Sequence, residues 1–160
     1  MYSRRVFAGA RAVFLAAILT FTVLILSAST ATAATPNCTT VSTLIKSAVG
    51  FAEPAPKVLH FRHTVDCSYA KQGRRGHTVL VRFTTGASRA TLAADRRSLD
   101  VGKQRAKTFG GLGSPAFSSV LPRGLSSTLV VLKGRTELLV TISAPLVKTA
   151  TLVRKLLPAL

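Results

Sequence analysis

Residues 126–144 read SSTLVVLKGRTELLVTISA and hold the clearest structural signal of the chain. Two runs rich in leucine and β-branched residues flank Lys133-Gly134-Arg135, which is typical of a β-hairpin with a glycine turn. Along the second arm one parity is apolar, with Leu138, Val140 and Ile142, and the other holds Glu137, Leu139, Thr141 and Ser143. This alternation predicts one buried face and one mostly wet face. Because a lone hairpin is marginal in water, other elements must support it.

The first 33 residues have the pattern of an export signal. Arg4, Arg5 and Arg11 form a basic start, residues 12–26 are apolar apart from two threonines, and Ala31-Thr32-Ala33 is a cleavage pattern. We therefore expect a signal peptide over residues 1–33 and one secreted domain over residues 34–160, with an uncleaved membrane anchor as the alternative. Residues 3–7 resemble a twin-arginine signal, so the general secretory and twin-arginine routes both stay open.

The charge of the chain is strongly positive. The net charge is +17, and removal of the three signal arginines leaves 19 Lys and Arg against 5 acids, or +14, on residues 34–160. Such a field concentrates polyanions near the protein and makes their binding sensitive to salt. Outside a cell the expected partners are anionic wall polymers or anionic lipid head groups, and nucleic acid is the least expected of the three.

Cys38 and Cys67 are the two cysteines of the chain. In an exported protein such a pair predicts one disulfide, which on the chain-entropy model stabilises the fold by roughly 3 to 4 kcal/mol. Two free thiols or half of a metal site are the alternatives. The sequence has no Cys-x-x-Cys motif to support the metal site.

The remaining elements are predicted from periodicity and turn residues. We expect a helix over residues 41–49, capped by Thr39 or Thr40 and ended by Gly50. One strand is expected over residues 58–69, with Leu59, Phe61, Val65, Cys67 and Tyr69 on its inner face, and a second over residues 77–85. A polar helix is expected from Ser88 to about Ala106, a glycine-rich turn over residues 108–121, and an amphipathic helix over residues 146–160.

These elements predict an α+β fold, in which an antiparallel sheet of four or more strands is covered by helices and linked by one disulfide. Basic residues gather in the turn after the first strand and on the polar helix, where spacings of seven, seven and four bring several cations together. That helix either covers the sheet as a plain surface helix or docks its basic face on a polyanion. The candidate polyanion-binding residues are Lys71, Arg74, Arg75, Arg89, Arg96, Arg97, Lys103, Arg105 and Lys107.

Several short motifs together resemble a known group of proteins. They are an early helix with a Cys, Cys-Ser-Tyr at the end of a strand, Gly-Leu-Gly-Ser-Pro-Ala-Phe at residues 111–117, Leu-Val-Val-Leu-Lys-Gly at residues 129–134 and a final Leu-Val-Arg-Lys-Leu-Leu helix. This combination resembles the small secreted and lipoprotein domains of unknown function of actinomycetes. Those domains are similar in fold to the PsbP-like α/β sandwich and to receptor-kinase sensor domains. The resemblance implies a fold but no catalytic residues, and this chain lacks a lipidated cysteine and is unusually basic.

Motifs for catalysis do not come together in the sequence. Residues 111–116 fit G-x-G-x-x-A but lack the preceding strand and the following helix of a dinucleotide site. Residues 68–71 read S-x-x-K, yet on a strand Ser68 and Lys71 point apart. The three histidines do not converge on a metal, and five acids give paired-carboxylate catalysis little to use, so all five are expected in surface salt bridges.

We therefore expect a non-catalytic binding or accessory protein of the cell envelope, with no cofactor and no metal. Its positive charge would attract anionic wall polymers or lipid head groups. The alternatives are a membrane-active cationic protein that uses its C-terminal helix and the basic helix from Arg89 to Lys107, and an enzyme whose site is assembled from scattered residues.

Overall fold

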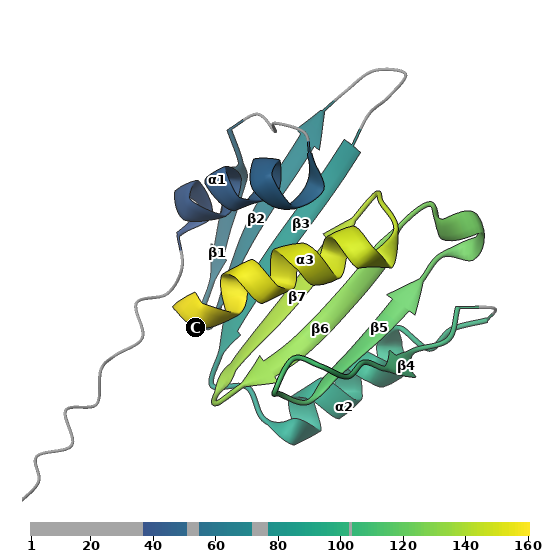
Figure 1. Ribbon diagram of the computed structural model, residues 1–160. Coiled ribbons are helices and arrows are strands. Elements are labelled where there is room, and N and C mark those ends of the chain that lie inside the picture. Colours follow the sequence, from purple (N-terminus) through teal and green to yellow (C-terminus); the bar gives the residue numbers. More distant parts are fainter. Residues whose placement is uncertain (1–36, 51–54, 72–76, 103) are drawn as a thin grey trace, which may run out of the picture. The chain divides into compact units, whose positions relative to one another are not determined.

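The computed structural model describes residues 37–50, 55–71, 77–102 and 104–160, apart from the side chain of Lys71. Within this part of the chain the strands form one seven-stranded antiparallel sheet (Figure 1). The elements are α1 (Cys38–Val49), β1 (Lys57–Phe61), β2 (Thr64–Lys71), β3 (His77–Thr85), α2 (Arg89–Ser98), β4 (Lys107–Thr108), β5 (Ala116–Val120), η1 (Pro122–Gly124), β6 (Ser127–Lys133), β7 (Thr136–Ile142), α3 (Leu146–Leu156) and η2 (Leu157–Ala159). The strand order is β1-β2-β3-β7-β6-β5-β4, which confirms the α+β class.

The two faces of the sheet are covered differently. Helices α1 and α3 contact each other and lie over one face, whereas α2 lies on the opposite side beside β5 and β6 (Figure 1). The main core is between the sheet and the α1–α3 pair, and its fully buried large side chains include Tyr69, Phe83, Leu129, Leu138, Ile142, Ile45, Leu152 and Leu156. A smaller core beneath α2 holds Ala106, Phe117 and Val130. The fold therefore has a thick apolar side and a thinly covered side.

Helix α1 is held at its start by a cap and by the disulfide. The side chain of Asn37, rather than Thr39 or Thr40, caps the helix by accepting a hydrogen bond from the Thr40 N–H at 2.8 Å. Gly50 ends α1 with φ of 84°, as predicted, since glycine adopts this left-handed conformation without strain. Cys38 is bonded to Cys67, with their Cα atoms 5.4 Å apart, so the predicted disulfide joins α1 to β2.

The predicted single strand over residues 58–69 is instead a hairpin. Chain reversal at Arg62 and His63 divides it into β1 and β2, and Val58 then pairs with Cys67. The face prediction for β1 is therefore wrong: Leu59 and Phe61 lie on the side opposite Cys67, and both are exposed. The turn contains neither glycine nor proline, and the apolar residues of the predicted inner face keep the same parity on both sides of it, with His63 as the one exception.

The β6–β7 hairpin confirms the prediction from residues 126–144. Lys133 pairs with Thr136, and Gly134 opens the two-residue turn with φ of 59°. The inward residues of β7 are buried as expected. Glu137, expected on a mostly solvent-exposed face, is only 2% exposed, because it lies beside Asp95 of α2 on the second face of the sheet.

Two further predictions need correction on the α2 side. Helix α2 begins after Ser88 as expected, but it ends at Ser98, about two turns before Ala106. The segment predicted as a long turn over residues 108–121 contains β5, which pairs with β6. Gly111 and Gly113 do form a turn, with φ of 77° and 67°. The C-terminal helix was placed correctly, since Ala150, Val153 and Leu156 of α3 are buried.

Candidate anion-binding groove

The predicted polyanion-binding residues fall into three groups. Arg89, Arg96 and Arg97 are on α2. Arg105 and Lys107 follow it, with Lys107 in β4, so the expected single helical face through Lys107 does not exist. Arg74, Arg75 and Lys103 lie outside the described residues, and for Lys71 the structure describes only the backbone at the end of β2.

Two adjoining hollows run along α2, and we call them together the α2 groove. The first, of about 430 Å³, lies between the start of α2 and the β6–β7 turn, and Ser88, Arg89, Leu132 and Arg135 border it. The second, of about 420 Å³, lies between α2 and the β4–β5 strands, and it is bordered by Arg89, Leu92, Arg96, Thr108, Ala116 and Phe117. Arg89 and Pro115 border both hollows. Three arginines therefore follow one another along a floor that is mostly apolar.

Local sequence explains why α2 starts at this point. Gly86 takes φ of 73°, and the Ala87 N–H donates to the Arg135 carbonyl at 2.9 Å, which ties the start of α2 to the β6–β7 turn. Ser88 and Thr91 then form a capping box, in which each side chain accepts a hydrogen bond from the other residue's backbone N–H. These contacts bring Arg89 and Arg135 to the same end of the groove, although 46 positions separate them in the sequence.

The packing of α2 on the sheet is light. The helix contains no buried residue, and Leu92 and Leu99 pack against the smaller core of Ala106, Phe117 and Val130. Arg96 donates from its guanidinium to the Ala106 carbonyl at 3.4 Å, and the Ser119 hydroxyl donates to the Leu99 carbonyl at 3.4 Å. The groove is therefore walled by a helix that few buried contacts hold in place.

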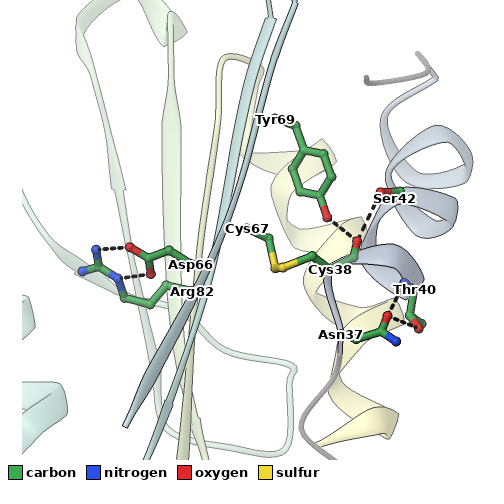
Figure 2. The surroundings of a disulfide bond; sticks show 8 residues. All are labelled: Asn37, Cys38, Thr40, Ser42, Asp66, Cys67, Tyr69 and Arg82. Carbon is green, nitrogen blue, oxygen red and sulfur yellow. Dashed lines mark hydrogen bonds and ion pairs between the residues drawn. A yellow bond between two sulfur atoms is a disulfide. The ribbon is translucent and has the colours of Figure 1, made fainter. Parts of the chain in front are cut away.

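Most described acids are collected in one place, which we call the Arg82 cluster: Asp66, Arg82, Asp95 and Glu137. Arg82 donates two hydrogen bonds to Asp66, at 2.7 and 2.8 Å, on the sheet face opposite the disulfide (Figure 2). The pKa of Glu137 is raised to about 8, first by burial of its carboxyl and then by the neighbouring Asp95, against the lowering effect of Arg82. The expectation of a surface salt bridge is wrong for Glu137, which is 2% exposed and forms no ion pair with a described residue; Asp66 does form a salt bridge, with Arg82, but is only 6% exposed.

This arrangement leaves the surface cations with few acidic neighbours. The one other ion pair of the described residues joins Arg105 to Asp100, at 3.7 Å, and both side chains are exposed. In the same part of the chain Arg89, Arg97 and Lys107 form no ion pair. Their positive field is therefore not neutralised within the described protein.

The motifs that resembled catalytic signatures have the structures expected of turns and strands. Ser68 lies in the middle of β2 and Lys71 at its end, so they are not one helical turn apart. The Gly111–Ser114 turn leads into strand β5 and not into a helix. Among the described residues, no group of three or more His, Cys, Asp and Glu side chains is arranged to hold a metal ion. No described helix is long and apolar enough to cross a membrane.

Comparisons with known proteins do not add a family to this description. No protein-family model matches the chain, and no match was found among curated proteins or among solved structures. The resemblance to secreted actinomycete domains and to the PsbP-like sandwich therefore stays a prediction.

Part of the groove could be predicted from the sequence. Arg89 and Arg96 were identified by their spacing of seven, which places them on one side of a helix. Arg135 was missed because it was assigned only to a turn, and the contact of that turn with α2 is not local. The sequence also gave no sign that Asp95 would meet Glu137, which is 42 positions further along the chain.

Proposed function

We propose that this protein is an exported, non-catalytic module that binds anionic polymers or anionic lipid head groups of the cell envelope. One observation carries the proposal: most of the described acids are in the Arg82 cluster, while cations that form no ion pair line α2 and its surroundings. Spatial separation of charge leaves a positive surface whose field acts on external anions rather than on the protein's own acids. The export signal predicted over residues 1–33 would deliver the protein to the cell envelope, where these anionic ligands are found.

The enzyme alternative has weaker support. Asp66 is held by two hydrogen bonds from Arg82, and the Glu137 carboxyl is buried, so neither is presented to a substrate. The Arg82 cluster contains no histidine: His60 is in β1, His63 in the following turn, and His77 at the start of β3. An acid–base site needs a group within hydrogen-bond reach of the reacting atom.

The membrane-active alternative also has weaker support. Such activity requires an apolar helix face that can enter a lipid surface. The apolar face of α3 is used in the main core, where Leu152 and Leu156 are fully buried, and Leu92 and Leu99 at α2 pack against the smaller core. The folded protein would have to open these cores before the apolar side of either helix reached lipid.

The proposal is tested by sedimentation of the purified protein with isolated cell envelope and with phosphatidylglycerol vesicles. We expect binding at about 50 mM NaCl that is largely lost by about 500 mM, because screening shortens the reach of the field. Phosphatidylcholine vesicles are the uncharged control. Binding that ignores salt, or equal binding to both vesicle types, contradicts the proposal.

A further inference from the structure

We infer that the α2 groove is the binding site of a linear phosphodiester polymer, which lies along α2 with its phosphates against Arg135, Arg89 and Arg96. This assignment rests on the proposed function and specifies the ligand and the place where it binds. The groove, the order of its arginines and its apolar floor carry the argument.

The arginines are spaced for a ligand whose charges are separated. Arg89 and Arg96 are seven residues apart on α2, which is about 10 Å along a helix axis. Arg135 borders the other end of the groove, beyond Arg89. A chain that places an anionic group at intervals of this order meets each guanidinium in turn. Arginine suits phosphate because its planar fork donates two parallel hydrogen bonds.

The floor of the groove fits uncharged links between the phosphates. Leu92, Ala93 and Ala116 border it between Arg89 and Arg96, and Leu132 borders it near Arg135. Such a floor contacts the CH groups of a polyol or sugar link without requiring hydrogen bonds from it. Among the described residues no acid borders either hollow, so a phosphate there would not meet a carboxylate directly.

The shape of the groove favours a chain over a lipid surface. Its arginines line hollows of about 420 and 430 Å³ instead of standing on a flat face. A single chain enters such a groove, whereas the head groups of a bilayer form a plane. Single-stranded nucleic acid binds proteins largely by stacking bases on exposed aromatic rings. Of the described residues that border the groove, the one aromatic is Phe117, which is 2% exposed and offers no such ring face.

The test compares two triple variants of the protein that lose the same amount of positive charge. The groove variant is Arg89→Gln/Arg96→Gln/Arg135→Gln. The control is Arg62→Gln/Arg123→Gln/Lys155→Gln, at three exposed cations that do not border the groove. Binding of purified poly(glycerol phosphate) wall polymer is measured by titration at low salt, and circular dichroism with thermal melts verifies that both variants fold.

We expect the groove variant to lose at least tenfold in affinity and the control to lose less than threefold. For short oligomers of the polymer, affinity should rise with length and level off once the chain spans all three arginines. NMR amide shifts on binding should concentrate at Ala93, Leu132 and Ala116.

Other results overturn the inference in distinguishable ways. Equal losses in both variants mean that the general field binds the polymer; the groove assignment then fails while the proposed function stands. Tighter binding of polyglutamate, or of phosphatidylglycerol vesicles, overturns the phosphodiester polymer as the occupant. If the unmodified protein shows no salt-sensitive binding to any of the anionic probes, the proposed function itself is contradicted.

Discussion

The Glu137 carboxyl of β7 is buried beside Asp95 of α2, and its Oε2 atom has no hydrogen-bond partner among the described residues. The pKa of Glu137 is raised from its ordinary value of 4.5 to about 8, first by burial and then by Asp95, against the lowering effect of Arg82. Between these two values the folded protein keeps a proton that the unfolded chain releases. The free energy of unfolding should therefore fall as the pH rises from about 4.5 to about 8, and change little from this cause above that.

Glu137→Gln tests this relationship. The amide has nearly the same shape and cannot ionise, so the variant should lose the fall in stability that Glu137 causes over this pH range. Urea denaturation of both proteins at intervals from pH 5 to pH 9 measures the difference. Asp100→Asn, at a more exposed carboxyl, is the control and should keep the full pH dependence. Parallel curves for Glu137→Gln and the unmodified protein would refute the assigned pKa.

Ionisation of Glu137 should also loosen α2 before the rest of the protein. Glu137 contacts α2 through Asp95, and α2 has no buried residue of its own, whereas α1 is joined to β2 by the disulfide. Repulsion between two adjacent carboxylates acts directly on the lightly packed helix. Once exchange rates are corrected for pH, the amides of α2 should lose protection between pH 6 and pH 9 while those of α1 keep theirs. Equal loss in both helices would show that only global unfolding responds to pH.

The local parts of this fold could be predicted from the sequence, and the contacts that connect distant segments could not. The β6–β7 hairpin was predictable because alternation and Gly134 act within a few residues. Strand β5 was missed because the three glycines and the proline just before it made the whole segment look like a turn; Ser118 and Ser119 of β5 are buried, Ser119 close to Leu99 at the end of α2. The α2 groove and the Arg82 cluster depend on where α2 meets β7 and the β6–β7 turn, which no local pattern encodes.

The link between α1 and β2 should contribute strongly to stability through its disulfide. The Cys38–Cys67 bond closes a loop with a sequence separation of 29, which on the chain-entropy model contributes about 3 to 4 kcal/mol. Cys38→Ala/Cys67→Ala should lower the free energy of unfolding by about this amount in chemical denaturation. A loss well under 1 kcal/mol would show that packing alone holds α1 in place.

Tyr69 supports the same link from the buried side. Its hydroxyl donates to the Cys38 carbonyl, which also accepts from the Ser42 hydroxyl at 3.1 Å (Figure 2). Because Ser42 keeps that carbonyl satisfied, Tyr69→Phe should cost only about 1 kcal/mol. Its cost should shrink in the cysteine-free variant, where α1 can shift; a double-mutant cycle of the two changes measures this coupling. An additive cycle would show that the hydrogen bond and the disulfide act independently.

Removal of one partner of the Arg82–Asp66 pair should lower the free energy of unfolding by more than the pair contributes to stability when both partners are present. The Asp66 side chain is nearly buried, so Arg82→Met leaves its carboxylate without its two donors, at an expected cost of about 1 to 3 kcal/mol. Loss of Arg82 also removes the charge that lowers the pKa of Glu137, so the pH-dependent fall in stability should extend to higher pH. Arg62→Met, at an exposed arginine, is the control. An unchanged upper limit of the pH profile would show that Arg82 does not act on Glu137.

Strand β1 offers a test of how the second sheet face is covered. Phe61 lies on that face, at the edge of the sheet, and is 60% exposed, whereas Phe83 on β3 is fully buried in the main core. Phe61→Ala should change the free energy of unfolding by less than about 0.5 kcal/mol, and Phe83→Ala should cost about 3 to 5 kcal/mol. Phe61→Ala should also reduce self-association at high protein concentration in light scattering, because an exposed apolar edge strand favours pairing between molecules. A cost above about 1.5 kcal/mol for Phe61→Ala would show that another part of the chain covers this edge.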